Sequence, residues 1–139
     1  MTKETLYRCR SHALKYRDLR AELEAVYNTA KSVPFSETPG RSSNKGTGDP
    51  TARAAYRAMD LEDELRRAQA DAMDAADEVE AWMDEADIEP AASAGIRLYF
   101  IVGMDWREIE KHLTPLNGRG AKLRIKSKTE KALTAAGIL

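Results

Sequence analysis

The sequence has little of what several fold classes and cellular settings require. Its single cysteine, Cys9, excludes an internal disulfide framework and is typical of a reducing compartment. Aromatic residues make up only 6% of the chain, which does not favour a β-sandwich. No apolar run approaches the roughly 18 residues of a membrane span, and the opening MTKETLYRCR lacks the apolar segment of a signal peptide. We therefore expect a cytoplasmic protein that does not enter the membrane.

What the sequence does have is alanine and charge, as in long helices and coiled coils. The net charge of −1 hides a strong asymmetry along the chain. Residues 53–89 hold 13 acidic against 4 basic residues, whereas residues 119–131 hold 6 basic against 1 acidic residue. Residues 1–31 are mildly basic, with 7 basic and 4 acidic residues. The local charge, rather than the overall pI, is therefore the guide to binding partners.

A first helix is predicted over residues 3–31, because apolar residues recur there at steps of three and four. The stretch SVPFSETPGRSSNKGTGDP that follows is rich in proline, glycine and serine, and it predicts a mobile loop over residues 32–50. The apolar stripe of the first helix consists of Leu6, Cys9, Ala13, Tyr16, Leu19, Leu23, Val26 and Ala30.

A second, longer helix is predicted to start at Asp49-Pro50 and to end at Glu89-Pro90. Its apolar positions alternate steps of three and four for four heptads, which is the seam of a coiled coil or of a long antiparallel hairpin. Because much of this seam is alanine, each contact buries little area, and we expect the hairpin to pack on a second copy or on the C-terminal unit. The seam consists of Ala58, Leu61, Leu65, Ala68, Ala72, Ala75, Val79, Trp82 and Ala86.

Three short helices are predicted after Pro90. The first covers residues 91–102, offers Ile96, Leu98, Tyr99, Phe100 and Val102 to a core, and stops at Gly103. The second covers residues 106–113 behind a capping box formed by Asp105 and Glu108, and carries Trp106, Ile109 and Leu113 on one face. The segment TPLNGRG is expected to break the chain before a last helix over residues 121–133.

The predicted fold class is therefore all-α: a long, coiled-coil-like helical hairpin in residues 1–89, followed by a three-helix unit in residues 90–139. The order of helix, turn, capped helix, turn and basic helix is that of a helix-turn-helix DNA-binding unit. The last helix would then lie in the major groove of double-stranded DNA. Its predicted buried half carries Ile125, Thr129, Ala132 and Leu133, and its polar half carries Arg124, Ser127, Lys128 and Lys131, with Leu123 left unexplained among the polar positions. The candidate DNA-binding residues are Arg119, Lys122, Arg124, Lys126, Ser127, Lys128 and Lys131.

The run IRLYFIVGMDWREIEKHL resembles the helix-turn-helix of sigma-factor region 4, through Arg97, Leu98, Tyr99, Gly103, Trp106 and Ile109. From Ser36 onward the chain is similar to the ArpU/RinA-type transcriptional regulators of phages and prophages. The last helix corresponds by position, and TPLNGRG is longer than the usual turn of that family. The resemblance implies a sequence-specific regulator of phage or prophage genes, often late genes, that works on DNA in the bacterial cytoplasm.

Two other functions fit the same pattern. A small terminase-like DNA-packaging subunit would also combine a helix-turn-helix with a helical hairpin, and a helical interaction protein would use the acidic helix and bind no DNA. In the favoured interpretation the long helices form a homo-oligomer, and RNA polymerase is a possible further partner. No enzyme activity, catalytic residue, cofactor or metal site is predicted, since His12 and His112 lie in separate helices and no grouping of acidic residues with cysteine has metal-ligand spacing.

Overall fold

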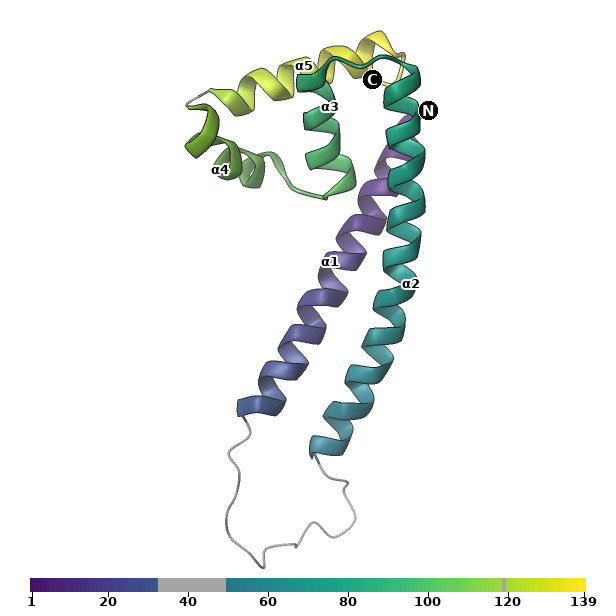
Figure 1. The fold of residues 1–139 in the computed structure, drawn as a ribbon, viewed down its shortest axis with the longest axis vertical. Helices are drawn as coiled ribbons and strands as arrows, with labels where there is room; N and C mark the ends of the chain where they lie inside the picture. Colours follow the sequence, from purple (N-terminus) through teal and green to yellow (C-terminus); the bar gives the residue numbers. More distant parts are fainter. Residues whose placement is uncertain (33–49, 119) are drawn as a thin grey trace, which may run out of the picture.

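A computed structural model of the chain describes residues 1–32, 50–118 and 120–139. They form α1 (Lys3–Ser32), α2 (Pro50–Glu85), α3 (Pro90–Ile96), the π-helical turn η1 (Arg97–Ile101), α4 (Trp106–Asn117) and α5 (Ala121–Ala135) (Figure 1). Within these three ranges there is no β-strand, so the all-α prediction is confirmed. None of the described helices combines the length and apolarity needed to cross a membrane. The loop predicted over residues 32–50 falls largely outside the described residues.

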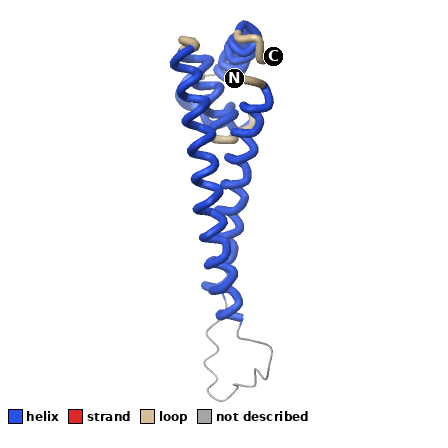
Figure 2. Tube along the Cα trace, turned by 90° about the vertical axis from the view of Figure 1, so that its right-hand side faces the viewer, coloured by secondary structure: helices blue, strands red, loops and turns tan. Residues whose placement is uncertain are grey.

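The two long helices lie side by side along most of their length, as two views at right angles show (Figures 1 and 2). Leu19, Leu61 and Ala68 are buried between them, with Tyr16, Leu23, Val26 and Leu65 packed around this cluster. Polar contacts join the two helices at the end that lies far from the chain termini. There Arg57 pairs with Glu22, and the Tyr27 hydroxyl donates to Glu62. The predicted hairpin is confirmed, and its two apolar stripes are confirmed for the residues whose burial is described, apart from Ala86.

The second helix ends earlier than predicted, at Glu85 instead of Glu89. The chain reverses at Asp87, which has a φ of +51°, and the Ile88 amide donates to the Met83 carbonyl at 3.2 Å. Aspartate tolerates this left-handed conformation better than most residues. The chain can therefore turn at Asp87, three residues before Pro90. As a result Ala86 is exposed instead of lying on the seam, and Met83 takes a buried place that the spacing did not predict.

The C-terminal helices pack on the end of the hairpin where the two chain termini meet (Figure 1). One cluster of buried residues joins both parts of the chain. Its buried members are Leu6 and Cys9 of α1, Val79 and Met83 of α2, and Ile96, Phe100, Leu133 and Ile138 of the C-terminal segment. The hairpin and the three-helix unit therefore share a core.

The helix predicted over residues 91–102 is regular only to Ile96 and then widens into the π-helical turn. There the Val102 amide donates to the Arg97 carbonyl at 2.8 Å, five residues back. This extra residue per turn places Phe100 in the core and leaves Val102 43% exposed, so the expectation that Val102 joins the core is wrong. The chain leaves the turn at Gly103, whose φ of +83° favours glycine, as predicted.

The fourth helix begins as predicted, because the Asp105 carboxylate accepts from the Glu108 amide at 2.7 Å. It does not stop before Thr114, so the predicted break at the start of TPLNGRG is wrong: the helix runs through Pro115 to Asn117. A proline removes one backbone donor, and a single lost hydrogen bond in the last turn leaves the rest of that turn intact. The stop comes at Gly118, with φ +76°, and its amide donates to the Thr114 carbonyl at 3.1 Å.

Candidate nucleic-acid interface

The fifth helix is the element predicted to meet DNA, and a glycine sets its position. It crosses α3 at Gly95, where a Cβ atom would stand 2.0 Å from Thr129 Oγ1 and 3.0 Å from Ile125 Cγ2. The Thr129 hydroxyl is satisfied within its own helix by donating to the Ile125 carbonyl at 2.7 Å. The two helix backbones therefore approach closely without leaving a buried polar atom unpaired.

One side of α5 is buried and the opposite side faces solvent. Ala121, Thr129 and Leu133 are buried against the rest of the protein. Since a helix turns about 100° per residue, the strip between the two groups of basic residues on this helix carries Leu123, Ser127, Glu130 and Thr134, all of which are exposed. We call these four residues the outward ridge of α5. The predicted buried face of this helix, which included Ile125 and Ala132, is confirmed in its centre, and those two residues are half-buried.

The basic side chains of α5 lie on the two flanks of the outward ridge. Lys122 and Lys126 share the flank that faces α4, where Lys122 Nζ lies 3.1 Å from Glu110 Oε2 and Lys126 Nζ lies 5.9 Å from the centre of the Trp106 ring. The opposite flank carries three exposed basic residues, Arg124, Lys128 and Lys131. Of these, Lys128 forms an ion pair with Glu89, just before α3.

The structure thus brings together six of the seven candidate residues: Lys122, Arg124, Lys126, Ser127, Lys128 and Lys131. The seventh, Arg119, lies outside the described residues. The sequence pattern placed Arg124, Ser127, Lys128 and Lys131 on one polar half of this helix. In the structure Ser127 lies on the ridge and Lys122 and Lys126 lie on one flank, whereas Lys131 borders the other edge of the ridge and lies about as nearly opposite the buried side as Thr134 does.

Two arginines of α1 hold the turn that leads into α4. Arg10 donates to the Tyr99 carbonyl, donates to the Met104 carbonyl at 2.8 Å, and lies over the Tyr99 ring at 3.9 Å. Two helical turns further along α1, Arg17 donates to the Gly103 carbonyl at 2.9 Å and pairs with the Glu108 carboxylate at 3.0 Å. The capping box is therefore only half formed: Asp105 caps the helix, while Glu108 reaches across to α1 instead of back to residue 105.

These arginines were not identified from the sequence, although a signal was present. Arg10 and Arg17 are seven residues apart and border the apolar stripe, so they share a face of α1. Their partners are backbone carbonyls some 90 residues away, which no side-chain pattern reveals. Tyr99 completes the arrangement by stacking on Trp106, with ring centres 5.2 Å apart and planes 18° apart.

A further ion pair ties the same region to α2. The Arg97 guanidinium donates from Nε and Nη2 to the two Glu80 carboxylate oxygens, at 2.7 and 2.8 Å. This two-pronged hydrogen bonding lowers the pKa of Glu80 and raises the pKa of Arg97. Arg97 therefore orients η1 on the hairpin.

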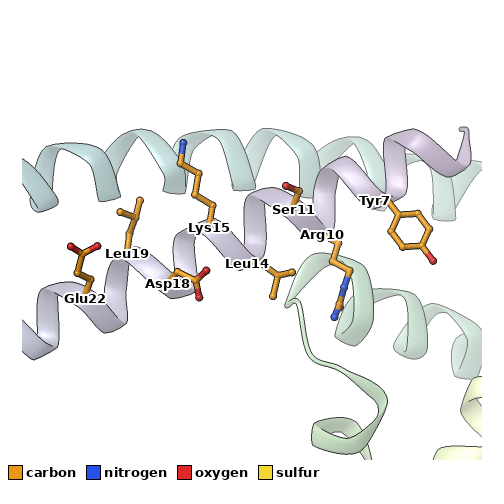
Figure 3. A pocket seen from close by; sticks show the side chains of 8 residues that line it. All are labelled: Tyr7, Arg10, Ser11, Leu14, Lys15, Asp18, Leu19 and Glu22. Carbon is orange, nitrogen blue, oxygen red and sulfur yellow. The ribbon is translucent and has the colours of Figure 1, made fainter.

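The structure also offers a hollow that does not qualify as a binding site. A groove of about 520 Å³ runs along α1 from Tyr7 to Glu22, and all eight residues that line it belong to this one helix (Figure 3). Arg10 and Leu14 point from it toward the turn at Gly103, and the other side chains spread along the helix (Figure 3). In the part of the chain that the structure describes, no three His, Cys, Asp or Glu side chains gather as they would to hold a metal ion.

Comparison of the chain with protein-family models, with curated proteins and with solved structures finds no match. The candidate interface is therefore judged on its geometry and charge.

Proposed function

We propose that the protein is a sequence-specific DNA-binding regulator of transcription, in which α5 enters the major groove. The observation that carries the proposal is the arrangement on α5, where basic side chains lie on both sides of an outward ridge whose one charged member is Glu130. A helix with its side chains is about 10–12 Å wide and the major groove about 12 Å. A ridge of this kind would face the base edges while the flanking lysines face the phosphates of the two groove walls.

The distribution of charge over the molecule supports the same orientation. Residues 90–139 hold 9 basic and 4 acidic residues, whereas residues 53–89 hold 4 basic and 13 acidic residues. The first turns of α5 project away from the hairpin (Figure 1). The acidic α2 would repel the phosphate backbone, so the duplex would approach the three-helix end and not the long arm.

The family resemblance adds a biological setting to the proposal. The resemblance of the sequence to ArpU/RinA-type regulators implies a role in the control of phage or prophage genes, often late ones. The proposal includes a homo-oligomer formed through α1 and α2, and RNA polymerase as a candidate further partner. Each is open to its own test.

One observation favours a different function, that of a helical interaction protein without DNA. Lys122 and Lys128 already pair with the protein's own Glu110 and Glu89. The four side chains are between 28% and 55% exposed, however, and an exposed ion pair contributes only about 0–1 kcal/mol. Phosphate can therefore replace these carboxylates at little cost, and the release of counterions from DNA favours the exchange.

The proposal is tested by measuring the affinity of the full chain for duplexes selected from a random library, over a series of salt concentrations. Log affinity should fall steeply with log salt, with a slope of about −0.9 for each phosphate contacted. In the double variant Lys122→Ala, Arg124→Ala, which removes one cation from each flank, affinity should fall and the slope should flatten by about 2.

The matched control is Lys3→Ala, Lys15→Ala, which removes the same charge from exposed positions on α1. It should leave the slope unchanged. Equal behaviour of the two double variants would defeat the assignment of α5 to DNA, and the absence of any enriched duplex would defeat sequence-specific binding altogether. A ring of many subunits in light scattering would favour the packaging alternative over regulation.

A further inference from the structure

Leu123 is an apolar side chain in an unusual place. It is 67% exposed and lies on the outward ridge, in the first turn of α5. The helix begins at Ala121, where the sequence places it, so a shifted helix start does not account for the exposure. With Ala121 buried two positions earlier, Leu123 is turned away from the protein interior.

The surroundings of Leu123 restrict what it could contact. Lys122 lies on the flank at one side of Leu123, and Arg124 lies on the flank at the other side. One helical turn further along α5, Ser127 continues the outward ridge. An apolar partner helix would have to be brought between two rows of cations. A polyanion with an apolar group recessed between its charges fits the arrangement directly.

Duplex DNA has this chemistry in its major groove. Two rows of phosphates border the groove, and the only apolar group on its floor is the 5-methyl group of thymine. The early turns of a recognition helix are the ones that usually approach base edges. Leu123 is therefore placed where it would meet the floor of the groove and not its walls.

We infer that Leu123 is a specificity-determining residue that packs on the 5-methyl group of a thymine in the bound site. This inference rests on the proposed function and adds a specific base to it: the site must contain a thymine opposite the first turn of α5. Neighbouring Ser127, as a hydroxyl that accepts or donates, would tolerate different bases at the adjoining step. The preference for thymine at the base that Leu123 contacts would then come from the burial of the thymine methyl group against the leucine side chain.

The test replaces, one at a time, each thymine of the selected duplex by deoxyuridine, which lacks only the methyl group. Affinities are measured for the full-length protein and for Leu123→Ala. At one or two positions uracil should weaken wild-type binding about fourfold, the effect of burying one methyl group. At those same positions Leu123→Ala should bind the thymine and uracil duplexes equally.

A matched variant separates contact from general weakening of the helix. Leu123→Met keeps an apolar side chain of similar size, so it should retain most of the preference for thymine over uracil. Because Leu123 is largely exposed, all three proteins should share the same circular dichroism spectrum and melting temperature. Light scattering of each variant shows whether the residue instead joins two copies of the chain.

The outcomes distinguish the two proposals. If no duplex binds, both the proposed function and this inference fail. If duplexes bind but no thymine position depends on Leu123, or if Leu123→Ala changes only the size of the oligomer, the inference fails and DNA binding by the flanking cations stands.

Discussion

Gly95 and Thr129 meet so closely that no side chain fits between them: a Cβ at residue 95 would lie 2.0 Å from Thr129 Oγ1. This contact fixes the distance between α3 and α5, and with it the position of the outward ridge. It also explains why the helix over residues 90–96 contains a glycine, although glycine disfavours a helix interior by about 1 kcal/mol relative to alanine.

Gly95→Ala should therefore destabilise the protein, although the same change stabilises most exposed helices. The clash forces α5 to shift or Thr129 to leave its rotamer, and overpacking of this kind costs about 1–3 kcal/mol. Urea denaturation followed by circular dichroism measures the loss. Adding Thr129→Ala removes the nearest atom and should return part of the stability, while the 3.0 Å approach to Ile125 Cγ2 remains. A Gly95→Ala protein as stable as the parent would show that the helices separate freely.

Arg10→Gln should loosen the attachment of the three-helix unit to the hairpin. The change removes a charged donor from the carbonyls of Tyr99 and Met104 and the cation from the Tyr99 ring. Hydrogen bonds to a charged group contribute about 1.5–3 kcal/mol, so amide exchange in residues 103–110 should accelerate at least tenfold. Exchange in the middle of α2 should not change.

The control for this experiment is Arg20→Gln, which removes an arginine from the same helix. Arg20 forms an exposed pair with Glu24, four residues along α1, with 3.8 Å between the charged atoms. It should leave exchange at residues 103–110 unaltered. Acceleration of equal size in both variants would mean that Arg10 has no specific role in holding the turn.

The ion pair between Glu80 and Arg97 predicts a dependence of stability on pH. Because Arg97 donates two hydrogen bonds to Glu80, the pKa of this carboxyl is lower in the folded protein than in the unfolded chain. A lowered pKa adds stability above the ordinary value of about 4.3, and that stability is lost as the pH falls through the folded value. Glu80→Gln should therefore be less stable than the parent at pH 7 and nearly equal to it at pH 3.

Both side chains are more than a third exposed, so solvent screening keeps the expected difference at pH 7 to about 0.2–1 kcal/mol. Urea denaturation at the two pH values measures it. Glu64→Gln removes the same charge from an exposed position of α2 and should show no such convergence between pH 7 and pH 3. A difference between Glu80→Gln and the parent that stays constant with pH would contradict the assigned pair.

How far the sequence predicts this molecule depends on the range of the forces involved. The stripes around Leu19 and Leu61 follow from helical periodicity, and the start of α4 follows from the local cap at Asp105. Contacts between distant segments were not predictable in this way. The partners of Arg10, the widened turn before Val102 and the early reversal at Asp87 depend on backbone geometry that becomes fixed only when the segments pack.

The candidate interface divides in the same manner. The basic character of α5 and its buried Thr129 and Leu133 were readable from spacing. The partners of its lysines were not, because the contacts with Trp106, Glu110 and Glu89 depend on how α3 and α4 lie against the helix. Leu123 shows what the sequence alone cannot predict. Its spacing marks it as an apolar residue among polar positions, but only the fold shows that its side chain remains exposed.

The shared core leads to a last prediction, on the independence of the C-terminal segment. Ile96, Phe100, Leu133 and Ile138 bury their side chains in one cluster with Leu6, Cys9, Val79 and Met83 of the hairpin. Exposing four large apolar side chains costs about 6–12 kcal/mol at about 1.5–3 kcal/mol each. This is as large as the whole stability of a typical small domain, about 5–15 kcal/mol.

A fragment of residues 90–139 should therefore show little helix by circular dichroism, and helix should appear when a fragment of residues 1–89 is added in equal amount. The intact chain at the same concentration provides the reference spectrum. A fragment of residues 90–139 that melts cooperatively alone would show that α3, α4 and α5 are sufficient for a core of their own. If the fragment is unfolded, its failure to bind a duplex says nothing about α5, so binding must be measured on the whole chain.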